Sequence, residues 1–587
     1  MKSTKRSSVP KASAPPSARD EAPPRTGLPL WAYFAAAAAV LLLAFEVYAP
    51  AIRGPFLFDD RYLPFFSPGL SVAPLSAWIA GVRPLLMFTF WLNYQIGQQD
   101  PYWYHIFNVL FHAGNAVLIG LIVWKILEWA GVASAVQRRI LAGFGGLLFL
   151  VHPIQTESVA YVASRSENLS VLLFNAAFAV FVWRRSVAVS VRVSIAVIVL
   201  FIAACVTKEH AAVLPALLLL TDYFWNPPAA FRLEGIRRNW KLYAPIAAGV
   251  VFAAAFITKV LGEAKTAGFG MKDLTWYEYF FTQCRAIWVY LRMFVLPFGQ
   301  NVDHEFAISR TLFDGGAVIG LVALIAVTAG AWVFRKRYPL AAYGWFAFLV
   351  LIAPTSSIVP IRDVLVERRL YLPFIGLILI ACEFLRRWRT KLTTLAVSLG
   401  AVVLVFAGLA YTRNQVWSDP LALWKDTADE SPHKSRPRFQ YAYALWSEQR
   451  CPEAAAEYEK ASKLESPDYS LYVDWALALD CAQHYDAALD KLRRALAIER
   501  TAHAYTLISM EYVKQNRRAE ALEALDQAEK TDPNFQQTYV FRGNVLLLNG
   551  DFDRAAEQFQ RAIQLNPADV NARNGLDMAQ RRVTPRM

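Results

Sequence analysis

The stretch QQTYVFRGNVLLLNGDFDRAAEQFQRAIQLNPAD, residues 536–569, decides the fold of the C-terminal third of the chain. Two series of alanines repeat with a period equal to the length of this stretch. The first series is Ala454, Ala488, Ala521 and Ala555, and the second, seven residues further along the chain, is Ala461, Ala495, Ala528 and Ala562. The spacing within each series is 33 or 34 residues. Small residues at this period indicate stacked helix–turn–helix units, each of which buries its apolar face on the next.

Glycine and proline positions indicate which kind of unit is repeated. Gly543 occupies the position where a tetratricopeptide repeat (TPR) has a small residue in its first helix, and Pro533 and Pro567 close the last two units. We therefore predict a TPR domain over residues 435–587, with about four units that start near positions 435, 469, 502 and 536. Such a stack offers a concave groove for an extended peptide or a partner helix.

The five cysteines of the chain divide between its two parts. Cys205, Cys284 and Cys382 lie in or beside apolar runs, where we expect them to be small core residues. Cys451 and Cys481 lie near the inter-helix turns of neighbouring repeats, and a disulfide can form between them if the array lies outside the cytoplasm.

Toward the N-terminus the composition is that of a membrane protein. The 587 residues are 56% hydrophobic, with a mean hydropathy of +0.28, which is too apolar for one soluble domain. The net charge of +13 does not indicate nucleic-acid binding, because many basic residues lie in short stretches between apolar runs, as membrane topology requires. Residues 1–28 are expected to form a disordered, basic, cytoplasmic tail, followed by an uncleaved signal anchor.

Twelve apolar runs are candidates for membrane spans: 29–49, 106–127, 139–151, 168–184, 191–206, 210–224, 242–260, 283–297, 313–334, 340–353, 369–384 and 392–411. If all of them span, the basic clusters at 335–337 and 386–389 lie outside, against the positive-inside rule. Removing run 283–297, which carries Arg285 and Arg292 on one helical face, places both clusters inside, so we predict an amphipathic interfacial helix there.

The resulting fold class is all-α: a polytopic membrane helix bundle of about eleven spans over residues 29–411, a linker over 412–434, and the TPR solenoid. The topology predicts five segments on the outer face: 50–105, 152–167, 207–209, 261–312 and 354–368. These segments hold most of the unusual polar residues of the bundle.

The most informative of these residues are the adjacent carboxylates Asp59 and Asp60, a few residues past the first span. A charged carboxylate is costly beside hydrocarbon, so its presence there suggests a function. One carboxylate can take a proton from an attacking hydroxyl while the other orients it. The alternative is a helix cap or a solvated pair in a loop.

Other polar motifs of the outer face also have two interpretations. Arg83 can meet a lipid phosphate or snorkel to the headgroups. His152 and Glu157 can hold a sugar or part of a metal site, or the loop can simply cap the next helix. Lys208 beside Glu209 can anchor a phosphate or be structural. The last motif is Arg368-Arg369, which can neutralise a phosphate with bidentate hydrogen bonds or lie at the interface.

Taken in order, these motifs resemble the family of transmembrane and tetratricopeptide-repeat O-mannosyltransferases, which have the GT-C glycosyltransferase fold. The resemblance begins near residue 29 and covers nearly all of the chain after it. It is carried by these stretches: Phe58-Asp59-Asp60, Arg83-Pro84-Leu85, Leu92-Asn93-Tyr94, Tyr104-His105, Asn108-Val109-Leu110, His112, His152-Pro153, Thr156-Glu157, Ser164-Arg165, Lys208-Glu209, Glu367-Arg368 and Leu370-Tyr371-Leu372-Pro373.

The resemblance implies inverting transfer of a sugar, usually mannose, from a polyprenyl-phosphate donor to Ser or Thr of acceptor proteins that the repeats engage. It implies a catalytic role for Asp59 and Asp60. Donor-phosphate or lipid-binding roles pass to Arg368, Lys208, Arg83, Arg369 and Tyr371. Sugar- or acceptor-binding roles pass to His152, Glu157, Arg165, Glu209 and Glu367. No cofactor is implied, and a divalent metal stays an open alternative.

The chain departs from animal members in having only four repeats and in Gln155 and Glu167-Asn168. The short array and the Ala and Arg content favour a bacterial inner-membrane protein with its active site and repeats on the periplasmic side. The endoplasmic-reticulum membrane, with a luminal site, is the alternative. A lipid-linked glycan polymerase or ligase, and a non-catalytic membrane scaffold with a TPR array, stay open as other functions.

Overall fold

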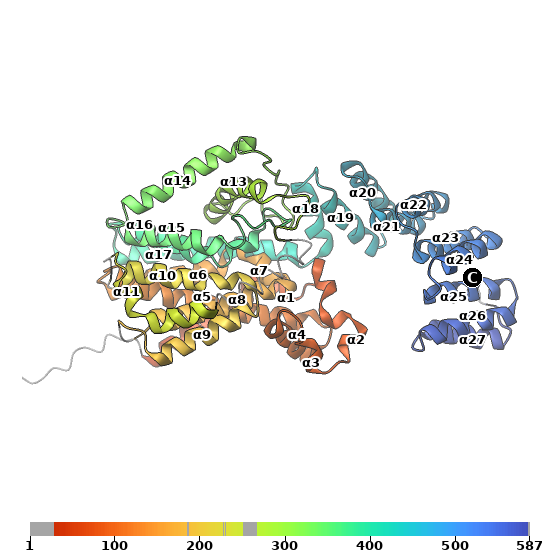
Figure 1. The fold of residues 1–587 in the computed structure, drawn as a ribbon, viewed down its shortest axis with the longest axis horizontal. Helices are drawn as coiled ribbons and strands as arrows, with labels where there is room; N and C mark the ends of the chain where they lie inside the picture. The colour runs from red at the N-terminus through yellow and green to blue at the C-terminus, as the bar shows by residue number, and fades with distance from the viewer. Residues whose placement is uncertain (1–28, 185–186, 227, 229–230, 250–266, 585–587) are drawn as a thin grey trace, which may run out of the picture.

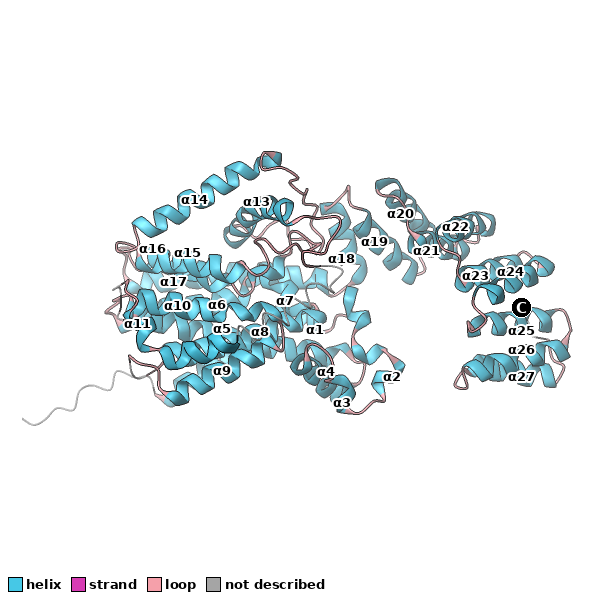
Figure 2. Cartoon of the chain, in the orientation of Figure 1, coloured by secondary structure: helices cyan, strands magenta, loops and turns pink. Residues whose placement is uncertain are grey.

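A computed structural model describes all residues except 1–28, 185–186, 227, 229–230, 250–266 and 585–587. Within this described part the regular elements are helices, and only two isolated bridges, Trp225–Pro228 and Ala267–Ile361, pair extended residues. The helices form a bundle and a curved array that extends from one end of the bundle (Figures 1 and 2). This confirms the all-α fold class.

The long helices of the bundle follow the predicted apolar runs. They are α1 (Leu30–Ile52), α5 (Pro101–Trp129), α6 (Ala135–Val151), α8 (Arg165–Val182), α9 (Val191–Cys205), α10 (Leu214–Trp225), α14 (Ala317–Val333), α15 (Pro339–Ile352), α16 (Phe374–Leu385) and α17 (Leu392–Trp417). Run 242–260 is helical over 240–249, and its remainder lies outside the described residues. One large apolar cluster fills the space between these helices.

Shorter helices lie at the two ends of the bundle. They are α2 (Pro68–Ser71), α3 (Leu75–Trp78), α4 (Pro84–Gly97), α7 (Thr156–Ala160) and α11 (Glu234–Arg238). Apart from α11, they lie in the predicted outer segments. No span is predicted over α4, in agreement with its length of 14 residues.

Among the described residues, length and apolar composition identify four helices that are able to cross a membrane: Phe34–Ile52, Pro101–Trp129, Asp314–Val333 and Leu392–Trp417. A fifth appears if α6 and residues 153–160, bent by 51°, count as one span. Helices α9, α15 and α16 are apolar but shorter than the ~20 residues that a span needs. The total of eleven spans stays a prediction.

Facing glycines explain how closely α15 and α16 pack. A Cβ atom on Gly344 would lie 2.5 Å from the carbonyl oxygen of Gly376, and a Cβ on Gly376 would lie 2.5 Å from the carbonyl oxygen of Gly344. Small residues at helix contacts are typical of membrane bundles, where van der Waals packing drives association. A side chain at either position would force these two backbones apart.

The run 283–297 lies in α13 (Trp276–Val295), which starts with a capping box. The backbone N–H of Thr275 donates to the Glu278 carboxylate (2.9 Å), and the Glu278 N–H donates to Oγ1 of Thr275 (3.4 Å). In Figure 1, α13 is seen nearly along its axis, whereas α14 and α15 run across the page. This orientation agrees with a helix that does not run parallel to the bundle.

The two flanks of α13 meet the same loop. Before the helix, the N–H of Gly268 donates to the carbonyl of Pro360 (2.8 Å). After it, the amide of Gln300 donates to the Glu367 carboxylate (2.9 Å). Because both flanks contact residues of one loop, α13 begins and ends at the same end of the bundle.

The array contains four helix pairs and a closing helix. The pairs are α19 (Ser435–Ser447) with α20 (Cys451–Leu464), α21 (Tyr469–Cys481) with α22 (Tyr485–Ile498), α23 (Ala502–Lys514) with α24 (Arg518–Thr531), and α25 (Gln536–Leu548) with α26 (Phe552–Leu565); α27 (Val570–Gln580) follows them. The four first helices begin at the predicted positions. A residue larger than glycine would not fit at position 543, because its Cβ atom would lie 2.7 Å from the Phe559 ring.

Two features of the array refine the sequence prediction. The segment 412–434, predicted as a linker, is largely helical, because α17 continues to Trp417 and α18 (Pro420–Glu430) follows it. Asp419 caps α18 by accepting from the N–H of Leu421 (2.9 Å). The structure also joins Cys451 and Cys481 by a disulfide, with their Cα atoms 5.7 Å apart.

Candidate active site

The five predicted outer segments meet at the end of the bundle that carries the array. Their contacts pair distant parts of the chain: Ala163 with Asp60, Arg83 with Glu209, Lys208 with Glu167, Arg368 with Glu157, and Gln300 with Glu367. Segments up to 211 residues apart in sequence therefore form one polar face.

Asp60 is buried and held by backbone donors. It lies in a 3-10 turn, Phe58–Tyr62, and is 1% exposed. Its carboxylate accepts hydrogen bonds from the N–H of Leu57 (3.0 Å) and the N–H of Ala163 (2.7 Å). Burial raises the pKa of Asp60 to about 7, although these backbone donors oppose the shift. Asp60 thus fixes the turn against the loop after α7.

Asp59, by contrast, is exposed. Its backbone N–H donates to the hydroxyl of Tyr161 (3.1 Å), which lies in the neighbouring loop. Burial, followed by the charges of Asp60 and Asp59, raises the pKa of Tyr161 well above its usual value, so its hydroxyl stays protonated. The two adjacent carboxylates therefore differ in situation: Asp60 is part of the framework, and Asp59 is open to an incoming group.

Three cations lie on the same face, each paired with a glutamate. The guanidinium of Arg83 donates to both oxygens of Glu209 (3.0 and 2.8 Å), and the ammonium of Lys208 donates to Glu167 (2.7 Å). Their side chains are 37% and 20% exposed. Since they are only partly covered, both cations keep donor positions that an anionic ligand can reach.

The third cation is Arg368. Its backbone N–H donates to the Glu157 carboxylate (2.8 Å), and its guanidinium pairs with the other oxygen of the same group. The side chain of Arg368 is 28% exposed, whereas that of Glu157 is 3% exposed. Arg368 is thus anchored by a buried partner and presents its remaining donors outward.

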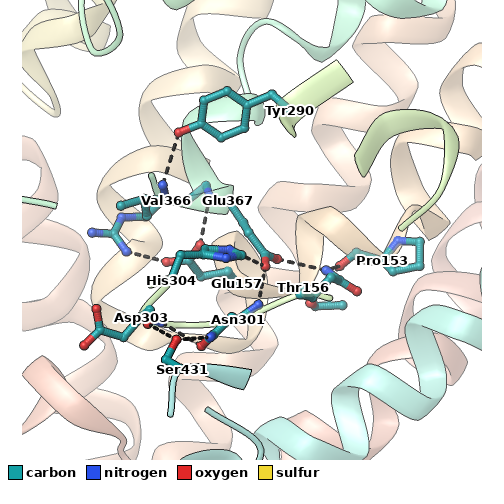
Figure 3. Close-up of polar contacts among 12 residues, drawn as sticks. Pro153, Thr156, Glu157, Tyr290, Asn301, Asp303, His304, Val366, Glu367 and Ser431 are labelled. Atoms are coloured by element: carbon teal, nitrogen blue, oxygen red, sulfur yellow. Dashed lines mark hydrogen bonds and ion pairs between the residues drawn. The ribbon is translucent and has the colours of Figure 1, made fainter. Parts of the chain in front are cut away.

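The neighbouring Glu367 is the centre of a buried hydrogen-bond network (Figure 3). It accepts from the Gln300 amide (2.9 Å), the N–H of Asn301 (2.5 Å) and Nε2 of His304 (3.1 Å). Burial acts to raise the pKa of Glu367, but the hydrogen bonds from His304 and Gln300, together with the nearby positive charge of His304 and Arg413, hold that pKa below its usual range. This network holds Glu367 in place and thereby fixes the backbone of the next residue, Arg368.

Four residues with predicted binding roles are instead committed to the framework. His152 is fully buried; its Nδ1 accepts from the N–H of Ile154 (3.2 Å), so its Nε2 donates to the carbonyl of Phe294 (3.0 Å). Tyr371 is fully buried and bonds to His112 (2.9 Å) and Asn168 (2.9 Å) inside the bundle. Neither His152 nor Tyr371 has a polar atom left for a sugar, a phosphate or a metal.

The other two are arginines. Arg165 is 0% exposed and donates to Asn108 (2.9 Å), Asn93 (2.5 Å) and the carbonyl of Tyr104 (2.8 Å). Arg369 donates to the hydroxyl of Tyr279 (3.0 Å) and to loop carbonyls. In both cases uncharged oxygens of the protein use the donors of the guanidinium, and the binding roles of Arg165 and Arg369 stay predictions.

Tyr161 and the segment 300–305 are functional parts of this face that the sequence motifs do not predict. That segment, Gln300-Asn301-Val302-Asp303-His304-Glu305, supplies three of the partners of Glu367. Its signal was available, because it is the most polar run of the long outer segment 261–312. Tyr161 carries no comparable signal. In the described part of the chain, no group of three or more His, Cys, Asp or Glu is arranged to hold a metal ion.

An apolar cavity of 620 Å³ lies between α13, α14, α15 and α16. At its α13 side it is lined by Leu291 and Phe294, and the carbonyl of Phe294 bonds to His152 next to the polar face. At the other side it is lined by Tyr338 and Phe384. The cavity therefore runs from the polar face along the bundle.

These observations define a class of protein: a helix bundle of membrane type, with a carboxylate and a row of cations on one loop face, joined to a TPR array. The family model described as "Tetratricopeptide repeat" matches residues 506–570, which confirms the repeat class.

Most of the chain is similar to proteins named protein O-mannosyl-transferase, which confirms the resemblance carried by the motifs. Protein O-mannosyl-transferase TMTC1 of Homo sapiens is 24% identical over 488 residues, covering 71% of this chain and 54% of that protein. Protein O-mannosyl-transferase TMTC3 of Mus musculus is 22% identical over 545 residues, covering 83% and 58%. The chain thus spans little more than half the length of these relatives.

Among solved structures, the TPR protein YrrB is 21% identical to this chain. The alignment covers 27% of this chain and 82% of that one, with a TM-score of 0.23.

Proposed function

We propose that this chain is an integral-membrane glycosyltransferase that moves a sugar, by analogy with its relatives mannose, from a polyprenyl-phosphate donor to Ser or Thr hydroxyls of polypeptides. The names of its relatives support protein O-mannosylation. The observation that carries the proposal is the exposed Asp59, which lies on the same face as the partly accessible cations Arg83, Lys208 and Arg368.

In the proposed reaction, the Asp59 carboxylate accepts the proton of the acceptor hydroxyl while that oxygen attacks the anomeric carbon. The bond between the anomeric carbon and the phosphate oxygen breaks, and its electron pair leaves with the lipid phosphate. Attack from the face opposite the phosphate inverts the anomeric configuration. The cations are suited to stabilise the charge that the departing phosphate gains, because guanidinium and ammonium groups bind phosphate by charge-assisted hydrogen bonds.

The donor lipid is the second part of the proposal. The cavity between α13 and α16 supports it, because its lining is apolar and its α13 side adjoins the loop of Glu367 and Arg368. A polyprenyl chain in this cavity would leave its phosphate near Arg368. Acceptor polypeptide would use the array, where a further cavity of 210 Å³ between α23 and α25 is lined by Lys514 and Asn544.

The test is transfer of label from polyprenyl-phosphate mannose to a Ser/Thr peptide by the purified protein. Asp59→Asn should lower the rate by roughly 10²–10⁴-fold, the usual contribution of a general base. Asp273→Asn, which changes an exposed acid elsewhere among the outer segments, is the matched control and should transfer normally. Full activity of the Asp59 variant would exclude it as the base, and no labelled peptide with any lipid-phosphate sugar would exclude transfer itself.

We further propose that this face lies outside the cytoplasm, in the periplasm if the membrane is a bacterial inner membrane. The positive-inside distribution of the basic clusters supports this orientation. Reporter fusions after Tyr411 should report an extracytoplasmic position, and a cytoplasmic signal would reverse the assignment.

A further inference from the structure

The first repeat touches the two loops that build the candidate active site. We call residues 420–443, which comprise α18 and the first turns of α19, the junction. One side of the junction meets the turn that carries Asp59, and another meets the segment 300–305 that holds Glu367. The array is therefore bonded to the site itself as well as to the end of α17.

The contact with the catalytic turn involves both residues that flank the two aspartates. The guanidinium carbon of Arg61 lies 4.7 Å from the centroid of the Tyr443 ring. The ring of Phe58 lies 5.4 Å from the ring of Trp424, at an interplanar angle of 64°. Such cation–π and edge-to-face contacts are directional, so they constrain the turn more than simple burial does.

The backbone of the turn explains why such a constraint is needed. Phe58 has a φ of 49°, in the left-handed region that a bulky L-residue rarely adopts. A backbone of this kind persists only where its surroundings over-determine it. Trp424 packs on the side chain of this residue, and Asp60 fixes the other end of the turn.

The contact with segment 300–305 is ionic. Asp303 is 4% exposed at its side chain and accepts from Nε and Nη2 of Arg436 (2.5 Å each) and from Lys434. Arg436 also donates to Asp363 (2.8 Å), in the loop that leads to Glu367. One arginine of the array thus ties together the two chain segments that fix Arg368.

A serine of the junction completes this contact. Ser431 donates from its hydroxyl to the carbonyl of Asp303 (2.9 Å) and accepts from the Asn301 amide (2.7 Å) and the N–H of Glu305 (3.0 Å). Figure 3 shows Ser431 directly beneath Asn301 and Asp303. Asn301 in turn donates its N–H to Glu367, so the junction is two hydrogen bonds away from the Arg368 backbone.

We propose that the junction is a positioning element of the active site: Trp424 and Tyr443 hold the Asp59 turn in its strained conformation, and Arg436 holds the Glu367–Arg368 loop. This inference rests on the proposed function for its kinetic consequences. Its structural consequences do not depend on that function. The competing interpretation is a plain attachment of the array, which would leave both loops unchanged when single contacts are removed.

The first experiment concerns the turn. Tyr443→Ala removes the ring under Arg61, Tyr443→Phe keeps it, and Tyr505→Ala removes an aromatic from the first helix of the third repeat. Hydrogen exchange of the peptide covering residues 57–63, whose amides of Asp60 and Leu63 are bonded within the turn, is the readout. We expect exchange to accelerate roughly three- to tenfold in Tyr443→Ala alone.

The kinetic arm separates positioning from folding. Tyr443→Ala should lower kcat by about tenfold or more at an unchanged KM for the lipid donor, because a misplaced base slows chemistry without touching the cations. Tyr443→Phe should restore kcat. If Tyr443→Ala does not fold, Arg61→Leu tests the same contact from the exposed side.

The second arm concerns the loop of Arg368. Arg436→Ala should accelerate exchange in residues 300–305 and raise the donor KM several-fold, because Arg368 loses its fixed backbone. Arg450→Ala is the matched control, since Arg450, which directly precedes α20, pairs only with Glu453 of that helix among the described ion pairs. It should change neither quantity.

The outcomes distinguish the two proposals. Unchanged exchange in Tyr443→Ala and Arg436→Ala overturns the positioning role, whether or not the wild type transfers sugar. Accelerated exchange with an inactive wild type supports the positioning role and refutes the proposed function. Equal acceleration in the Tyr505 or Arg450 controls would also overturn the inference, because it would show a general loosening of the array.

Discussion

Each end of the bundle buries a carboxylate, but the two are satisfied in opposite ways. At the end far from the array, Asp222 is 0% exposed and accepts from Arg184 (2.9 Å), Asn226 (3.0 Å), Asn239 (2.6 Å) and Tyr243 (2.7 Å). Two donors serve each oxygen. Here every interaction is internal, and the arginine is 5% exposed.

At the array end, the polar groups are less completely satisfied. Asp60 is buried, but Asp59 next to it is open, and the side chains of Arg83 and Lys208 are 37% and 20% exposed. The amide of the buried Gln155 finds no hydrogen-bond partner within the described residues. Buried polar groups are normally paired, so the unpaired Gln155 and the open Asp59 contrast with the hydrogen-bond network of Asp222, in which both carboxylate oxygens are fully used.

The largest expected effect is on folding at the far end. Asp222→Asn removes the charge partner of Arg184 and places an amide among three other donors. Breaking a buried pair in this way should cost about 3–5 kcal/mol. Thermal unfolding of the purified protein in detergent should show a clear fall in Tm, whereas Asp59→Asn should leave Tm within experimental error.

The activity of the two variants should show the reverse pattern. The folded fraction of Asp222→Asn should retain its specific activity. The Asp222 network includes Asn239, which directly follows α11, and α11 lies at the opposite end of the bundle from the array (Figure 1). A variant at Asp222 that folds normally but transfers no sugar would abolish the distinction between the two ends.

The same contrast explains what the sequence predicts. The period of 34 residues predicts the starts of all four repeats, because each small residue faces a fixed neighbour, such as Gly543 against Phe559. Apolar runs predict the bundle helices for a similar reason, since burial is a local requirement. The distribution of basic residues between the apolar runs predicts that the five outer segments lie at the same end of the bundle. This prediction is possible because it depends on many residues at once and not on any single one.

Roles of single polar residues are harder to predict, because the sequence does not show which partners the fold supplies. His152 and Arg165 are residue types that often line binding sites. In the structure, however, backbone groups of Ile154 and Phe294 use both ring nitrogens of His152. The side chains of Asn93 and Asn108 accept hydrogen bonds from Arg165. Asp59 and Asp60 are adjacent and identical in type. Asp60 is structural because the fold brings the N–H of Ala163 to its carboxylate, whereas Asp59 stays open.

The second expected effect is a pH dependence that belongs to Asp60. Its pKa is about 7 in the folded protein and near 4 in an unfolded chain. Between these pH values the folded state binds more protons than the unfolded state, so stability falls as pH rises from about 4 to about 7. Above pH 7 the whole penalty is present.

Asp60→Asn cannot ionise and should lack this dependence. Relative to the wild type, its free energy of unfolding should rise with pH through this window, by up to about 4 kcal/mol, and then stay level. Unfolding midpoints of both proteins at a series of pH values measure the difference. Parallel curves would mean that Asp60 is charged at low cost, and would remove burial as the property that separates it from Asp59.

The smallest expected effect comes from Arg83. Both partners in its pair with Glu209 are more than one-third exposed, so Arg83→Gln should change stability by less than about 1 kcal/mol. The buried Arg184 is its counterpart, and Arg184→Gln should cost about 3 kcal/mol because Asp222 stays behind without its cation. In a transfer assay, Arg83→Gln should raise the donor KM roughly tenfold, the worth of about one charge-assisted hydrogen bond. Equal destabilisation by the two variants, with an unchanged donor KM for Arg83→Gln, would show that the cations of the polar face are structural, as those of the far end are.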